Sequence, residues 1–377
     1  MFKKSFAVRC ATALLSALPA SQILAANAES TSVGGRLFLD FTYIDQKSNA
    51  VKTDASGVGT DVKRGYLIVN HSFDEIWSAN VTTDFNYVSS ANFAEVFIKK
   101  AYVQAKVSDA FAAQLGSADL PWVLFAESFY GYRYIEKLLI DRLSFGTTAD
   151  WGLHVNGKLA DNTVSYAVSV INGNGYRTTT RSKSVDVEGR IGYSPIQEVT
   201  IGAGFYRGKR GQQTETQSTA NTASRFDALV AFVNPQWRLG AEYFYAKDWG
   251  AGSAGTTVPT AAFVIVSPNE DKADGFSLWG AYNLDPSWSV FARADVSKPS
   301  KDLHPDLKDR YYNAGLAWHA NKKIDVALAV KREKVENGII NAYNGDITKT
   351  PKGFDGQIGG SVDGTYTEGG VWVLVNF

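Results

Sequence analysis

The sequence WSANVTTDFNY, from Trp77 to Tyr87, alternates apolar and polar residues with a period of two. The apolar side chains fall at positions 77, 79, 81, 85 and 87, and only Thr83 interrupts their row. Successive side chains of a β-strand point to opposite faces, so this pattern predicts a strand with one apolar and one polar face. A helix would instead repeat its apolar positions about every 3.6 residues.

The same alternation recurs along the chain and predicts an even number of strands. We expect 16 of them, at residues 33–43, 62–72, 77–88, 94–107, 110–117, 149–159, 163–172, 184–193, 199–208, 224–233, 237–248, 273–284, 288–298, 310–320, 324–335 and 365–377. Short turns such as Asp74-Glu75 and Asn234-Pro235 alternate with long, polar, Gly-rich connections. Amphipathic strands joined in this way are typical of transmembrane β-barrels.

A sheet that spans a membrane has to close, because lipid offers no partner to an unpaired backbone N–H or C=O group. The sequence therefore predicts an all-β fold, a 16-stranded antiparallel transmembrane β-barrel. The alternative, a soluble β-sandwich, would not need so many consecutive meander strands. No stretch after the first residues reaches the roughly 18 consecutive apolar residues of a transmembrane helix.

The two ends of the chain carry targeting features. Residues 1–28 combine a basic start, a short apolar stretch and the small-residue end Ala26-Asn27-Ala28, which is the plan of a secretory signal peptide. A membrane anchor is the alternative, but the apolar stretch is too short and contains Pro19 and Gln22. We therefore expect residues 29–377 to form the barrel. The final aromatic residue, Phe377, resembles the C-terminal signal by which bacterial outer-membrane proteins are recognised for insertion.

Composition excludes several classes of protein. The 377 residues contain 38 basic and 38 acidic side chains, so there is no electrostatic footprint for nucleic acid. A single Cys excludes a disulfide scaffold and a cysteine-based metal site. Residues 250–255 match G-x-G-x-x-G, but the following residues do not begin a helix, so we expect a loop and not a dinucleotide site. We expect no cofactor, no metal and no enzymatic activity.

Residues 117–148 form the longest connection and differ in composition from the other long loops. They are rich in apolar and aromatic side chains, with a helical turn expected at 135–139. Such a segment needs burial, and we expect it to fold inward and narrow the lumen. The alternative is packing on a neighbouring subunit. The expected pore-constriction residues are Tyr130, Tyr132, Arg133, Tyr134, Glu136, Lys137, Asp141 and Arg142.

Polar faces of the strands are expected to line the lumen. The expected wall residues are Arg36, Asp40, Asp84, Lys158, Arg190, Arg225, Arg238, Arg293 and Lys331. Further acidic residues share these faces, so counting gives no excess of the one sign that a strong ion filter requires. Separation of the two signs in space would still create a field. The strand at 94–107 has an ambiguous phase, and its three lysines, Lys99, Lys100 and Lys106, would alter the balance.

Several segments resemble the phosphate-selective porin O and P family of bacterial outer-membrane porins. They are Lys63–Gly65, Lys99–Val103, Ala113–Gly116 with Leu120-Pro121, Asp141-Arg142, Trp151-Gly152 with Val155–Gly157, and Tyr166–Gly173. The resemblance covers most of the chain after the signal peptide. It implies a homotrimer in the outer membrane of a Gram-negative bacterium, inserted by the outer-membrane assembly machinery. It also implies a third long loop that narrows the channel and basic residues that attract anions such as phosphate.

Two functions are compatible with these features. The first is a channel for the passive diffusion of small hydrophilic solutes across the lipid bilayer. The second is a surface protein whose long loops act as an adhesin or receptor. The strand number favours the channel, because barrels of roughly 16–18 strands leave an aqueous opening. The sequence names neither the solute nor the sign of ion preference, and it proves no oligomeric state.

Overall fold

The computed structural model describes residues 29–88, 93–216, 221–249, 270–341 and 357–377. The predicted signal peptide and the G-x-G-x-x-G segment at 250–255 lie outside the described residues. Each predicted strand is present, which confirms the assignment from two-residue periodicity. The strands are β1 (Ser30–Ser48), β3 (Gly57–Ser72), β4 (Trp77–Val88), β5 (Phe93–Ser108), β6 (Phe111–Asp119), β7 (Ala149–Leu159), β8 (Val164–Ile171), β9 (Asp186–Ile196), β10 (Val199–Gly208), β11 (Ala223–Val233), β12 (Trp237–Lys247), β13 (Lys272–Asn283), β14 (Trp288–Lys298), β15 (Lys308–Asn321), β16 (Ile324–Asn341) and β17 (Gln357–Asn376).

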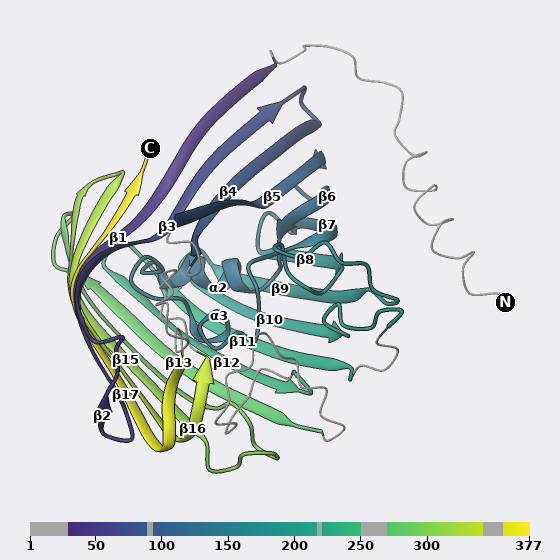
Figure 1. Ribbon diagram of the computed structural model, residues 1–377. Helices are drawn as coiled ribbons and strands as arrows, with labels where there is room; N and C mark the ends of the chain where they lie inside the picture. Colours follow the sequence, from purple (N-terminus) through teal and green to yellow (C-terminus); the bar gives the residue numbers. More distant parts are fainter. Residues whose placement is uncertain (1–28, 89–92, 217–220, 250–269, 342–356) are drawn as a thin grey trace.

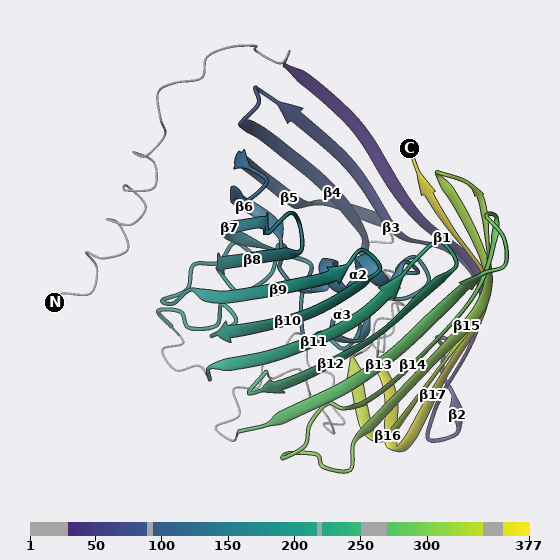
Figure 2. The same ribbon diagram turned by 180° about the vertical axis from the view of Figure 1, so that it is seen from behind.

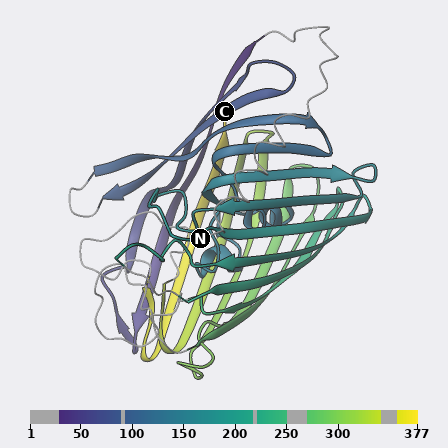
Figure 3. The same cartoon turned by 90° about the vertical axis from the view of Figure 1, so that its right-hand side faces the viewer.

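The strands form a single closed antiparallel sheet (Figures 1 and 2). Each strand pairs with its neighbours in sequence, and β1 closes the ring by pairing with both β3 and β17. The sheet has 17 strands because a two-residue strand, β2 (Val51–Lys52), pairs with the end of β1. The predicted 16-stranded barrel is therefore confirmed, with this one short addition. Figure 3 shows neighbouring strands running side by side around the wall.

The outer and inner faces of the wall have opposite chemistry. Large apolar side chains such as Phe41, Leu115 and Leu328 are exposed on the outside. Charged side chains such as Asp84 and Lys331 are buried on the inside. This is the reverse of a soluble protein and is the arrangement of a barrel whose outer face contacts lipid.

The long connection after β6 lies inside the barrel (Figure 1). It runs over residues 120–148 and contains the helices α2 (Val123–Tyr130) and α3 (Leu139–Arg142). Helix α2 ends at Gly131, whose positive φ of 82° suits glycine. The helical turn expected at 135–139 is wrong: the hydrogen-bonded turn spans 132–136, and the helix begins at Leu139. No helix in the described ranges is long and apolar enough to cross a membrane.

Candidate functional site in the barrel lumen

Loop 120–148 packs against the β9–β16 side of the wall. Several of its apolar residues, including Trp122, Ile135 and Leu139, have no exposed surface. Helix α2 contacts β11 and β12, and α3 contacts β13. Tyr132 stacks on Phe291 of β14 with ring centroids 4.4 Å apart. The loop is thus part of the barrel core, as its composition predicts.

Arg142 of α3 is the centre of a buried ion-pair network. Its guanidinium lies 3.3 Å from Asp295 and 2.8 Å from Asp309, and it also contacts Glu333. All four side chains are fully buried. Arg293 joins the network through Asp295, at 2.6 Å. These contacts attach the loop to three neighbouring strands, β14, β15 and β16.

A second network attaches the loop to the seam of the barrel. Glu136 lies 3.2 Å from Lys331, which also contacts Glu368 of β17. Lys63 of β3 then bridges Glu368 at 3.4 Å and Asp40 at 2.8 Å. The pairing crosses β16, β17, β1 and β3, so it links the loop to both sides of the strand closure.

Wall arginines also donate hydrogen bonds to backbone carbonyl groups of the loop. Arg225 donates to the carbonyl of Phe145 at 2.5 Å and also pairs with Asp227 at 2.8 Å. Further donations of this kind are Arg238 to Phe129 (2.6 Å) and Arg293 to Lys137 (2.5 Å). Since buried carbonyl groups need partners, these arginines replace water for an irregular loop.

Two β-bulges bring additional basic residues to the lumen. Between β1 and β3 the register skips Lys63, and between β4 and β5 it skips Lys99. Each extra residue adds a lysine next to a basic residue that already faces inward, Arg64 or Lys100. In a regular strand one residue of each pair would face lipid, at a cost of roughly 2–4 kcal/mol near the midplane. The bulges avoid this cost and concentrate positive charge on the β3–β5 wall.

Charged side chains of the loop and of this wall meet across the lumen. We call them the constriction cluster, which consists of Arg64, Lys99, Glu127, Arg133, Lys137 and Asp141. Arg133 lies 2.7 Å from Glu127 and 3.4 Å from Asp141, while Lys137 lies 3.9 Å from Asp141. Although burial raises the pKa of Asp141, the nearby cations outweigh it and lower that pKa below its ordinary value.

Lys99 differs from the other cations of the cluster. Its Nζ lies 4.6 Å from the ring centroid of Tyr66 and 5.7 Å from that of Tyr176, and it donates a hydrogen bond to the Tyr66 hydroxyl at 3.2 Å. No carboxylate within the described ranges lies within 4.0 Å of it. Its positive charge therefore lies against aromatic rings and makes no direct ion pair among these residues.

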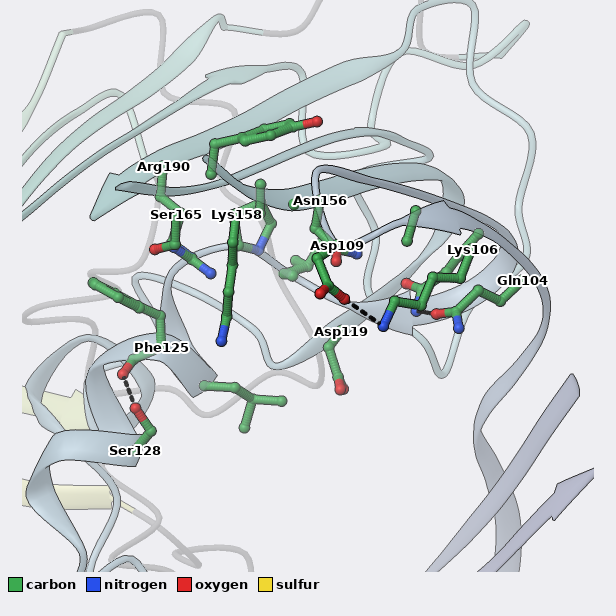
Figure 4. Close-up of a pocket in the computed structure, with 18 of the residues that line it drawn as sticks. Gln104, Lys106, Asp109, Asp119, Phe125, Ser128, Asn156, Lys158, Ser165 and Arg190 are labelled. Carbon is green, nitrogen blue, oxygen red and sulfur yellow. Dashed lines mark hydrogen bonds and ion pairs between the residues drawn. The ribbon is translucent and has the colours of Figure 1, made fainter. Parts of the chain in front are cut away.

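Two cavities flank the loop. One, of about 780 Å³, opens toward the short turns and is lined by Lys106, Lys158 and Arg190 (Figure 4). The other, of about 280 Å³, lies on the side of the long loops and is lined by Arg177 and Arg210 among others. Leu120, at the start of the loop, lines both. The loop therefore separates the two halves of the lumen.

Comparison with known proteins gives structural likeness only. No protein-family model and no curated protein matches the sequence. An anion-selective porin from Comamonas acidovorans aligns with a TM-score of 0.64 and 11% identity, over 93% of this chain and all (100%) of that one. The outer-membrane channel DcaP of Acinetobacter baumannii aligns with a TM-score of 0.63 and 13% identity, over 93% and 98% of the two chains.

A third similar structure is a trimer form of OmpT, an outer-membrane protein of Vibrio cholerae. Its TM-score is 0.58 at 12% identity, over 93% of this chain and 100% of that one. This chain has the porin fold. The identities are too low to carry more than the fold, so the solute and assembly of the porin-like barrel have to be argued from its own residues.

The predicted constriction residues divide into two groups in this porin fold. Arg133, Lys137 and Asp141 belong to the constriction cluster, with 10–15% of each side chain exposed. The others are buried between loop and wall: Tyr130, Tyr132, Tyr134, Glu136 and Arg142. Their burial gives them contacts that hold the loop in place.

The predicted wall residues fall into three groups. Those in contact with the loop or its ion-pair networks are Asp40, Arg225, Arg238, Arg293 and Lys331. Lys158 and Arg190 line the larger cavity, and Asp84 pairs with Arg64 at 3.0 Å. Arg36 is exposed near the C-terminus and donates a hydrogen bond to Asn376 at 2.8 Å.

Sequence reasoning missed Lys63 and Arg64 as lumen residues and left Lys99 undecided. One signal was available. Two adjacent basic residues inside an amphipathic strand conflict with period-two alternation, and a bulge resolves the conflict without exposing a charge to lipid. Arg177 and Arg210 were missed because they lie beyond the strand ends, where alternation gives no guide.

Proposed function

We propose that this protein is a passive diffusion channel of the Gram-negative outer membrane that admits small hydrophilic solutes and prefers anions. One observation carries the proposal. The ion pairs that hold loop 120–148 use carboxylates of the wall, such as Asp295 and Glu368, and bury them completely. Lys99, which is 7% exposed and has no such partner among the described residues, belongs to the constriction cluster on the opposite wall.

The size of this effect follows from Coulomb's law. Two unit charges at about 4 Å interact by roughly 1 kcal/mol in bulk water and by about 4 kcal/mol at an effective dielectric constant of about 20. Each 1.4 kcal/mol changes an occupancy by about tenfold, so even the lower value enriches anions severalfold beside Lys99. A balanced total of 38 basic and 38 acidic residues is compatible with this preference, because the two signs differ in where they lie.

The names of the similar structures support the proposal. One is called anion-selective, one is called a channel and one is a trimer form. A homotrimer is our proposal for this chain as well. Phosphate falls within the proposed solute class through the sequence resemblance. Export by residues 1–28 and recognition of Phe377 during assembly complete the proposal.

Ion replacement in single-channel recordings tests this function. The purified protein is placed in a planar bilayer in KCl, and the conductance is measured again after K⁺ is replaced by Li⁺ or Cl⁻ by acetate. We expect discrete channels whose conductance falls more on replacing the anion. A larger fall on replacing the cation would contradict the anion preference. The absence of discrete channels would contradict the channel itself and favour surface binding through the long loops.

A further inference from the structure

The smaller cavity, on the long-loop side of the constriction, has the features of a ligand site. We call it the entrance cavity. The lining residues used below are Tyr176, Arg177, Tyr206, Arg210, Arg225 and Trp249. Its volume is about 280 Å³. One water occupies roughly 30 Å³ of liquid, so the cavity has room for an organic molecule and is several times larger than a bare phosphate ion.

The acidic residues of the entrance cavity already have partners. Asp150 accepts hydrogen bonds from the backbone N–H groups of Trp151, Gly173 and Gly175, at 2.7, 2.9 and 3.1 Å. Glu188 accepts one from the backbone N–H of Trp122 at 3.0 Å and lies 3.4 Å from Arg225. Neither carboxylate is therefore directed at the basic residues on the opposite side of the cavity.

Arg177 and Arg210 have no acidic partner in the ranges that the structure describes, although Arg210 donates one hydrogen bond to the backbone carbonyl of Trp249. Both guanidinium groups lie over aromatic rings. Arg210 is 4.9 Å from the ring centroid of Trp249, and Arg177 is 4.5 Å from that of Phe97. A guanidinium that lies over a ring keeps its N–H donors in its own plane, where a carboxylate can accept two of them.

Aromatic rings also line the entrance cavity. Trp249 lies against Tyr206 with ring centroids 4.8 Å apart, and both face the cavity. Tyr176 stacks on Phe97 at 5.9 Å with an angle of 19° between the ring planes. Flat apolar surfaces beside unneutralised cations suit a ligand that has an anionic group on a planar apolar body.

This chemistry continues from the entrance cavity toward the constriction. From Tyr176, the surface continues through the cation of Lys99 to the rings of Tyr66 and Phe38, which are in edge-to-face contact at 6.1 Å. The guanidinium of Arg133 lies 5.9 Å from the ring centroid of Phe38. This strip of cations and rings therefore joins the cavity to the constriction cluster.

We propose that the entrance cavity captures small aromatic carboxylates, and that the strip of cations and rings leads them to the constriction. This inference rests on the proposed channel function and names a solute class for it. An inorganic anion would use only the cations of this surface. An aromatic carboxylate uses the cations and the rings together, and its size matches the cavity.

Calorimetric titration of the detergent-solubilised full chain tests the inference, with benzoate, benzamide and inorganic phosphate as probes. We expect saturable benzoate binding and no binding of uncharged benzamide. In Arg210→Gln, benzoate affinity falls about tenfold, since the ligand loses a charged hydrogen bond. Arg177→Gln weakens binding in the same direction, and Arg177→Lys, which keeps the charge, weakens it less.

Arg181→Gln is the matched control, because Arg181 is an exposed arginine on the same loop as Arg177 and does not line the cavity. It leaves benzoate affinity unchanged. Phosphate binding as tight as benzoate binding, equal effects of Arg181→Gln and Arg210→Gln, or no benzoate binding would each overturn the inference. Single-channel conductance in KCl is recorded on the same samples. Anion-preferring channels without benzoate binding would refute the capture site alone, whereas absent channels would refute the proposed function.

Discussion

Replacing Arg142 by methionine removes the centre of the network that holds the constriction loop. Arg142 is fully buried against Asp295, Asp309 and Glu333. Asp295 keeps Arg293 as a partner in the variant, and Asp309 keeps the hydroxyl of Ser297 at 3.1 Å. Glu333 loses the only ion pair that it makes within the described part of the chain.

The magnitude follows from this unequal loss. Breaking a buried ion pair on one side costs about 3–5 kcal/mol, because the remaining charge stays buried without compensation. This is equivalent to a decrease of about a hundredfold or more in the ratio of docked to released loop. The strand pairings do not involve Arg142, so the barrel itself should still assemble.

Single-channel recording is the assay. In Arg142→Met we expect a larger conductance with rapid current fluctuations, because the loop leaves the lumen for part of the time. Ion preference shifts toward cations as Asp295, Asp309 and Glu333 become accessible. The matched control, Arg142→Met with Glu333→Gln, removes the uncompensated charge and brings the conductance back toward that of the parent protein. A folded Arg142→Met variant with unchanged conductance, noise and ion preference would refute the role given to this network.

Three further predictions follow from the constriction and the chain end. Lys99→Gln should lower the ratio of anion to cation permeability severalfold. Lys272→Gln, which removes a lysine of an ion pair on the rim, should leave this ratio unchanged. Equal effects of the two variants in bilayer recordings would contradict the role of Lys99. Burial raises the pKa of Glu127 above its ordinary value. Acidification through that raised pKa should therefore remove a negative charge beside the cations and increase anion preference, and Glu127→Gln should abolish this pH response of the reversal potential. The backbone of Phe377 forms two hydrogen bonds with that of Gly35, at 2.9 and 3.1 Å. Deletion of Phe377 should therefore reduce the fraction of assembled barrel, which is seen as a heat-modifiable band in gel electrophoresis. An unchanged fraction would contradict the role of Phe377 in assembly.

Period-two alternation was sufficient to predict the strands, since lipid outside and water inside impose opposite chemistry on successive residues. The segment at 77–88 illustrates this, because its predicted bounds match β4. The apolar composition of residues 117–148 was sufficient to predict that the loop is buried inside the barrel. Both properties depend on local sequence, which is why a single sequence reveals them.

The charge arrangement of the lumen was beyond local sequence. Lys63 and Glu368 are 305 residues apart, and their contact depends on closure of the barrel between β1 and β17. The bulge at Lys99 depends on the register between β4 and β5. A count of charges ignores which charges are paired, so it predicted only a mixed wall. In the structure the carboxylates beneath the loop, such as Asp295 and Glu368, are paired with basic residues, whereas Lys99 has no carboxylate within 4.0 Å among the described residues.

The zero-current potential across a KCl gradient tests the central claim most directly, because it reports which ion crosses the constriction more easily. With the purified protein in a planar bilayer, we predict a potential of the sign set by chloride, since the carboxylates that hold the loop are paired and buried, whereas Lys99 has no carboxylate within 4.0 Å in the described ranges. A potential near zero, or one of the sign set by potassium, would contradict the claim that this separation of charges controls permeation.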